Sequence, residues 1–162
     1  MLGRRVAVAT LLLTACGGTP RADDPGSTAP PATGAPADGT FELPAEAAAG
    51  YPEAYIAAVV ANPPGDDLAV DGGEYVLIRS NLTIRTDMGG WTVDADGEVL
   101  PLGIGRQLDV GAELRLHTGR GTDDADDVFA GLDREVLDDG GLLVLRDSAG
   151  AEVARFAYGA AD

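Results

Sequence analysis

Lysine is absent from this chain: all 11 basic side chains are arginines, and they face 27 acidic side chains in 162 residues, giving a net charge of −16. This balance argues against binding nucleic acid through its phosphates, which requires clustered basic side chains. Cysteine, histidine and tryptophan each occur once. A single cysteine excludes an internal disulfide, and together with a single histidine it argues against a thiolate or multi-histidine zinc site. The length is that of one domain with a tail.

The first sixteen residues have the pattern of an export signal. Two arginines at 4–5 precede an apolar run at 6–13, which is shorter than the roughly 20 residues needed to span a bilayer. The run ends in LTAC at 13–16, which resembles the bacterial lipobox, where cleavage precedes a cysteine that carries a diacylglyceryl group. We therefore predict a lipoprotein signal peptide over residues 1–15 and lipidation at Cys16. An ordinary signal peptide and a twin-arginine signal are the alternatives.

Residues 16–52 are predicted to be a disordered tether. They hold seven of the ten prolines, many small residues and no apolar periodicity. Such a segment cannot bury enough apolar surface to offset the entropy of ordering its backbone. Only 45–49 has the composition of a short helical turn. Loss of the signal peptide would leave a net charge of −18, of which −14 belongs to residues 53–162.

Residues 53–162 have the pattern of a small all-β domain. Short apolar or alternating segments recur between turns rich in Gly, Asp, Asn and Pro. The only weak helix candidate is 126–132, and about 100 residues of short strands are typical of an immunoglobulin-like β-sandwich. The segments expected to be strands are 55–61, 74–80, 91–93, 99–102, 113–118, 142–146 and 152–158.

The order of several short motifs resembles the lamin tail domain family. The matching segments are NPPGDD at 62–67, GEYVLI at 73–78, GWTV at 90–93, LDVG at 108–111, LLVLRDSAG at 142–150 and FAY at 156–158. The resemblance implies an immunoglobulin-like sandwich and an interaction module without catalytic activity. In bacteria this module occurs in secreted and surface proteins, often beside extracellular nucleases or other hydrolases. The chain departs from the family at 88–91 and 110–111, where MGGW and VG replace LSGW and PG.

One acidic segment is a candidate cation site. Calcium takes six to eight oxygen ligands, often carboxylates from flexible loops. A calcium loop would use Asp123, Asp124, Asp126 and Asp127, joined by the acidic pairs at 66–67 or 138–139 if the fold brings them together. The spacing does not match an EF-hand, and a solvated acidic loop is the alternative. No other cofactor is expected.

No catalytic constellation is evident in the sequence. His117 lacks a Gly-x-Ser-x-Gly partner motif, and the domain's only serines are Ser80 and Ser148, so we interpret His117 as an exposed histidine at a strand end. Trp91 is expected to pack in the core rather than to form a carbohydrate or peptide platform. The glycine-rich stretches at 103–106 and 119–122 lack the Gly-Lys-Ser/Thr of a phosphate-binding loop and are expected to be turns.

Together these patterns predict an envelope lipoprotein on the extracytoplasmic face of the cell membrane, held there by its N-terminal lipid. Its domain is expected to be a non-catalytic binding or scaffolding module for a protein or envelope partner, and not for nucleic acid. The alternative is an accessory factor to a separately encoded extracellular hydrolase or nuclease. In neither case is the chain itself expected to be an enzyme.

Overall fold

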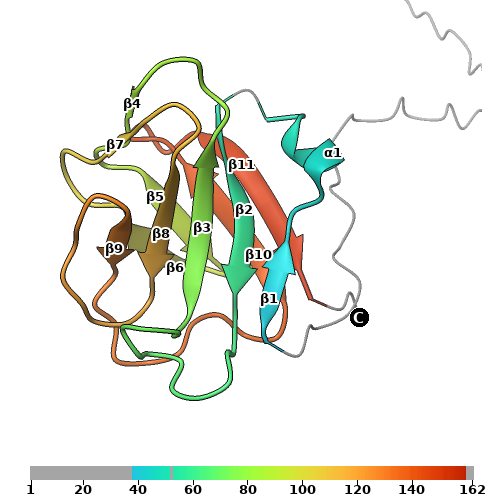
Figure 1. Cartoon of the computed structure of the whole chain (residues 1–162), viewed down its shortest axis with the longest axis vertical. Helices are drawn as coiled ribbons and strands as arrows, with labels where there is room; N and C mark the ends of the chain where they lie inside the picture. The colour runs from blue at the N-terminus through green and yellow to red at the C-terminus, as the bar shows by residue number, and fades with distance from the viewer. Residues whose placement is uncertain (1–37, 52, 160–162) are drawn as a thin grey trace, which may run out of the picture.

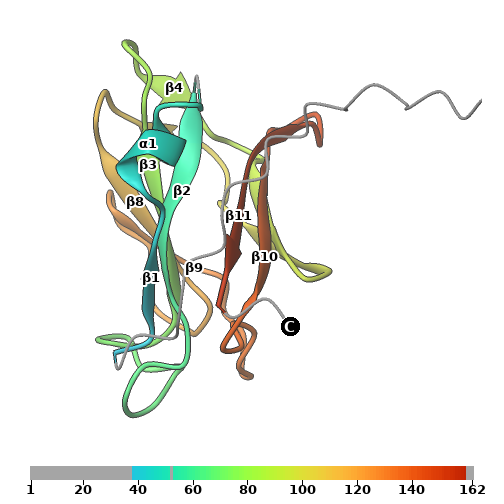
Figure 2. The ribbon, with the colours of Figure 1, turned by 90° about the vertical axis from the view of Figure 1, so that its right-hand side faces the viewer.

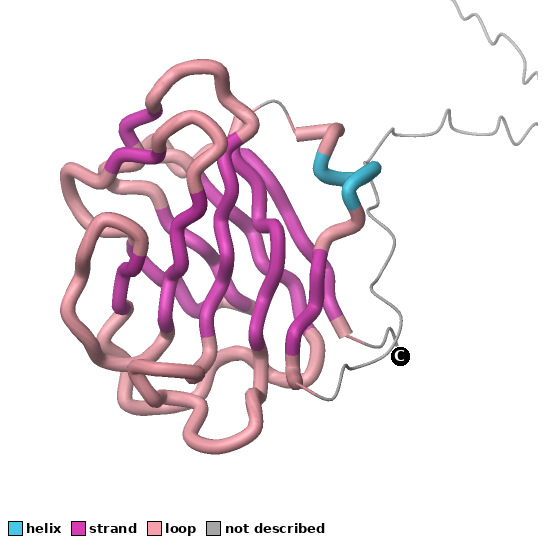
Figure 3. The backbone as a smooth tube through the Cα atoms, viewed as in Figure 1, coloured by secondary structure: helices cyan, strands magenta, loops and turns pink. Residues whose placement is uncertain are grey.

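Two β-sheets face one another across an apolar core, as Figure 2 shows edge-on. The computed structural model describes residues 38–51 and 53–159, so the predicted signal peptide and Cys16 lie outside the described residues. The elements, shown in Figures 1 and 3, are β1 (Thr40–Glu42), α1 (Ala45–Ala48), β2 (Ala54–Val60), β3 (Tyr75–Ser80), β4 (Thr86–Asp87), β5 (Thr92–Ala95), β6 (Glu98–Pro101), β7 (Gln107–Leu108), β8 (Glu113–His117), β9 (Asp127–Phe129), β10 (Gly141–Arg146) and β11 (Glu152–Tyr158).

The front sheet in Figure 1 has the strand order β1-β2-β3-β8-β9, and the rear sheet has the order β11-β10-β5-β6. Neighbouring strands are antiparallel except β8 and β9, which run parallel. The short strands β4 and β7 form a separate two-stranded ribbon at one end. This arrangement confirms the prediction of an all-β, immunoglobulin-like sandwich, and the strands predicted from alternation correspond to β2, β3, β5, β6, β8, β10 and β11.

Buried and exposed side chains alternate along the strands, and the buried ones face the space between the two sheets, where they form the core. In β3 and β8 the fully buried side chains are Val76, Ile78, Leu114 and Leu116, and the residues between them point to the outer face. The rear sheet contributes Val93, Leu143, Leu145 and Phe156 to the same cluster. Trp91 is only 5% exposed and belongs to this core, as expected.

The domain begins earlier than predicted. The tether was expected to run to residue 52, but β1 pairs with the edge of β2, with Phe41 opposite Val59. Phe41 and Leu43 are buried in the core, and the Phe41 ring lies 5.2 Å from the ring of Tyr158. Because proline and alanine dominate the sequence around this segment, its average composition is that of a linker, and its two buried apolar side chains do not stand out. The helical turn expected at 45–49 is present as α1.

The weak helix candidate at 126–132 was wrong. This segment contains β9, which pairs with β8 through the partners Leu116 and Val128. Val128 is 2% exposed and faces the core, whereas Asp127 and Phe129 lie on the outer face. A short isolated helix has little intrinsic stability, so pairing with the edge of β8 decides the conformation.

Candidate binding site on the outer face of the front sheet

The outer face of the front sheet brings together ionisable and aromatic side chains from β3, β8 and β9. Strand register sets them in two rows, because residues opposite one another on neighbouring strands have adjacent side chains. The first row is Tyr75, His117 and Phe129, and the second is Leu77, Arg115 and Asp127. All of these side chains except Leu77 line the pocket described below.

His117 is the centre of the aromatic row. Its imidazole stacks on the Phe129 ring, with centroids 4.5 Å apart and planes at 12°, and lies 5.5 Å from the Tyr75 ring at 48°. His117 is only 8% exposed. The expectation of an exposed histidine was therefore wrong, because the parallel strand β9 places an aromatic side chain directly beside it.

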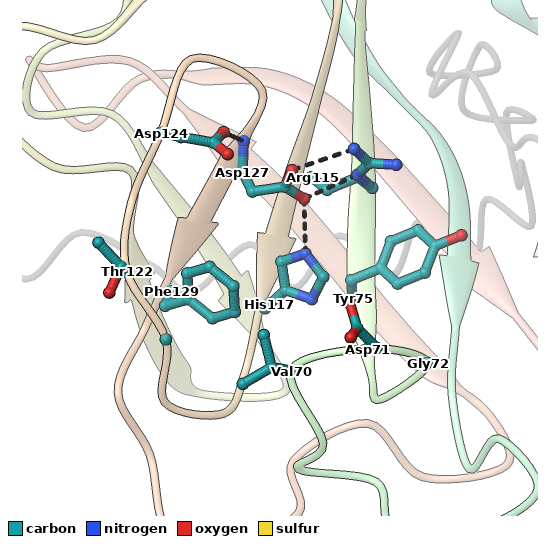
Figure 4. Close-up of a pocket in the computed structure, with 11 residues that line it drawn as sticks. Val70, Asp71, Gly72, Tyr75, Arg115, His117, Thr122, Asp124, Asp127 and Phe129 are labelled. Carbon is teal, nitrogen blue, oxygen red and sulfur yellow. Dashed lines mark hydrogen bonds and ion pairs between the residues drawn. The ribbon is translucent and has the colours of Figure 1, made fainter.

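Asp127 joins the two rows. Its carboxylate accepts hydrogen bonds from Arg115 at 2.8 and 3.0 Å and contacts Nε2 of His117 at 2.7 Å (Figure 4). The Arg115 guanidinium, assisted by His117, holds the pKa of Asp127 below its usual value. Because an ionised carboxylate only accepts hydrogen bonds, Nε2 carries the proton and donates it. In the neutral ring the other nitrogen, Nδ1, is then a lone-pair acceptor; it is buried and has no hydrogen-bond partner within the described residues.

A pocket of about 540 Å³ opens over these side chains. The β2–β3 loop borders it at Val70, Asp71 and Gly72, and the β8–β9 loop borders it at Thr122 and Asp124 (Figure 4). Apolar and charged groups therefore line the same hollow. An arrangement of this kind orients a ligand, since a pocket of apolar surface with a few placed polar groups is typical of small-molecule and side-chain recognition.

Of the predicted calcium residues, Asp124 and Asp127 line this pocket. The carboxylates of Asp123, Asp124 and Asp127 accept hydrogen bonds within the protein, whereas the exposed Asp126 carboxylate makes none with the described residues. Asp124 Oδ1 accepts hydrogen bonds from the backbone amides of Asp126 and Asp127, both at 2.9 Å. Asp123 accepts from the Phe129 amide at 3.0 Å through Oδ1 and from Arg106 at 3.2 Å through Oδ2.

The Arg106 guanidinium places a positive charge among the loop oxygens that a bound cation would otherwise contact. Its guanidinium, whose side chain is 13% exposed, donates to the backbone carbonyls of Asp124 and Ala125 as well as to Asp123. Among the additional acidic residues proposed as ligands, Asp139 accepts a hydrogen bond from the Asn62 side chain. Across residues 38–51 and 53–159, no group of three or more His, Cys, Asp or Glu side chains is placed to hold a metal ion. Calcium binding stays a prediction from the sequence.

Glu74 is a buried carboxylate that the sequence reasoning missed. It is 1% exposed and accepts a hydrogen bond from the Thr118 hydroxyl at 2.9 Å and from the amides of Val136 and Leu137 at 3.3 Å. Burial raises the pKa of Glu74 above its usual value, against the opposing effect of these hydrogen bonds. Glu74 thus links β3 to the end of β8 and to the β9–β10 loop.

The remaining residues of the site were also missed. Tyr75, Arg115 and Phe129 carry no motif; the signal available was the outward alternation of Glu113, Arg115 and His117, which marks a face but not its neighbours. The neighbours on β9 follow only from a parallel pairing. The two domain serines do not complete a triad with His117: Ser80 faces inward on β3, and Ser148 lies in the β10–β11 turn near Gly90.

No helix among the described residues has the length and apolar character that crossing a membrane requires. No protein-family model matches this chain, and a search of the curated proteins finds no match to it.

Proposed function

We propose that this chain is an envelope lipoprotein whose lamin-tail-like domain binds a partner without catalysing a reaction. The observation that supports non-catalytic binding most directly is the pairing of the outer-face groups. Asp127 is committed to Arg115 and His117, and neither domain serine is positioned as a nucleophile for His117. What the face offers instead is a pocket with apolar walls and fixed polar groups, which suits recognition.

The proposed anchor is tested by fractionation. Wild-type cells fed a palmitate analogue are expected to show label on this protein in the membrane fraction. Cys16→Ala removes the acceptor thiol, so label and membrane association are expected to disappear together. Gly18→Ala, two residues beyond the proposed attachment point, is the matched control and should behave as wild type. Retention of the Cys16→Ala protein in the membrane fraction would remove the basis for a lipid anchor.

The proposed partner class is tested by affinity capture with the lipidated full chain. Recovery of wall or surface components supports the scaffold, and stoichiometric recovery of a secreted nuclease or other hydrolase supports the alternative of an accessory factor. Phe129→Ala removes the ring that supports His117, so a partner that uses the outer face should be lost. Val99→Ala, at an exposed position on the rear sheet, is the control.

A further inference from the structure

We infer that the pocket beside His117 is a binding site for a primary ammonium group on an apolar stem. This inference rests on the proposed binding function and names the ligand class for the same face. It begins from Nδ1 of His117, which is buried without a hydrogen-bond partner among the described residues. Leaving a buried polar atom unpaired is costly, so this nitrogen favours the binding of a ligand that supplies the missing partner.

In the neutral ring the missing partner is a donor. Asp127 takes the proton-bearing nitrogen, Nε2, and Nδ1 then presents a lone pair. Figure 4 shows Nδ1 pointing away from Asp127 and toward the β2–β3 loop, where Val70 and Asp71 lie. Because Nδ1 itself is buried, a ligand that enters between this loop and the sheet must displace the atoms that cover Nδ1 before it can offer an N–H or O–H group to the ring.

The charges around Nδ1 favour an ammonium over a hydroxyl donor. Asp71 is exposed and makes no hydrogen bond or ion pair with any other described residue, yet it lines the same pocket. Arg115 also lines the pocket, but its positive charge is balanced by the bidentate ion pair with Asp127, which lies at the opposite edge of the imidazole from Nδ1 (Figure 4). The net charge of −14 over residues 53–162 also raises the local concentration of cations.

The rest of the pocket suits a short hydrocarbon stem. Tyr75 and Val70 present apolar surface at its edge, and Val70 is 55% exposed, so a stem that covers it removes apolar area from water. The combined requirement is an alkyl chain that ends in a protonated amine. A lysine side chain of a partner polypeptide and a free small amine share this chemistry.

The inference is tested by ¹⁵N NMR on the purified full chain carrying Cys16→Ala, in which the imidazole signals are unambiguous because His117 is the only histidine. Butylammonium, butyltrimethylammonium and 1-butanol are titrated at constant ionic strength. Butylammonium is expected to bind with a Kd on the order of 1 mM, as befits so small a ligand, and to shift the Nδ1 resonance. The trimethyl cation has no N–H donor and butanol has no charge, so both should bind at least about tenfold more weakly.

Matched variants separate a specific site from general attraction. Asp71→Asn is expected to weaken butylammonium binding about tenfold. Glu135→Gln removes the same unit of charge at another exposed position and should leave it unchanged. His117→Phe keeps a stacked ring but removes Nδ1, and should abolish binding. The inference fails if Nδ1 does not shift, if the trimethyl cation binds equally well, or if the two acidic variants weaken binding equally.

Two further probes identify the source of the amine. Tighter binding of Nα-acetyl-lysine methylamide than of butylammonium supports a lysine of a partner polypeptide, and tighter binding of butylammonium supports a free amine. Both results support the ammonium site. Because these titrations involve neither membrane nor partner, their failure leaves the proposed anchoring and scaffolding standing, and a failure of the fractionation or capture experiments leaves the ammonium site standing.

Discussion

Glu74 accepts a 2.9 Å hydrogen bond from the hydroxyl of Thr118 in a part of the domain that water does not reach, since the two residues are 1% and 0% exposed. Burial dominates the balance at this carboxyl and raises its pKa. The folded state therefore keeps the Glu74 proton to a higher pH than the unfolded state does.

The free energy of unfolding of the domain should depend on pH through the titration of Glu74. The contribution of this group is fully present below the ordinary carboxyl pKa of 4.5 and is lost as pH rises through the higher folded-state pKa. Glu74→Gln removes the titration, so the free energy of unfolding of wild type relative to Glu74→Gln should fall between pH 4 and pH 7. Denaturant titrations across this range measure it, with Glu135→Gln as the exposed control. A difference independent of pH would contradict the raised pKa.

Asp127 should show the opposite pH dependence. Its folded-state pKa is lowered, chiefly by Arg115, so its contribution is present above the usual pKa of 3.8 and is lost as pH falls through the folded value. Asp127→Ala leaves His117 without its partner and is expected to cost about 1–3 kcal/mol in the free energy of unfolding at pH 7. Asp109→Ala breaks a solvent-exposed ion pair with Arg85 and should change stability less. Equal losses would show that the partial burial of Asp127 has no energetic consequence.

Gly121 is expected to tolerate no side chain. A Cβ atom at this position would overlap the ring of Phe129, which also stacks on His117. Gly121→Ala should therefore cost about 1–3 kcal/mol and displace the Phe129 ring. At Gly50 the added carbon meets only a carbonyl at 3.2 Å, so Gly50→Ala is the milder control. Denaturant titration and the aromatic proton shifts of Phe129 report both effects, and wild-type values for Gly121→Ala would contradict this packing.

Trp91 provides an optical test of the core. Because it is the only tryptophan and is 5% exposed, native fluorescence should be blue-shifted and resistant to quenching by iodide, and both properties should be lost on unfolding. Trp91→Ala is expected to destabilise the domain by about 3–5 kcal/mol. Ile104→Ala, at a fully exposed loop tip, should leave stability unchanged. Ready quenching of the native protein would instead favour a surface platform.

Arg106 should stabilise the β8–β9 loop in place of a metal ion. Its guanidinium bonds to the carbonyls of Asp124 and Ala125 and to the Asp123 carboxylate, so Arg106→Ala should lower the thermal midpoint. With these oxygens engaged, we expect millimolar calcium to leave the wild-type midpoint unchanged. A ligand that binds only the native state must raise the midpoint, so a rise with calcium would support the site that the acidic sequence suggests.

The sequence by itself determined the fold class and most strands, because alternation along one strand is a local property. Glu113–His117 shows this: its inward leucines are readable without knowing what they pack against. Trp91 was identified separately, because a large aromatic side chain in a strand usually packs in the core. No such signal marks Phe41 and Leu43, where a composition typical of linkers surrounds an edge strand.

Only the tertiary structure decided what His117 does. Its burial, its stacking on Phe129 and its contact with Asp127 all depend on a parallel pairing between β8 and a segment that leaves and returns to the sheet. Likewise, Arg106 reaches the acidic loop from a turn 17 residues away. These contacts depend on the register of strand pairing and on the path of the loops. Both are set by the packing of the two sheets, so they produce no repeating pattern in the sequence.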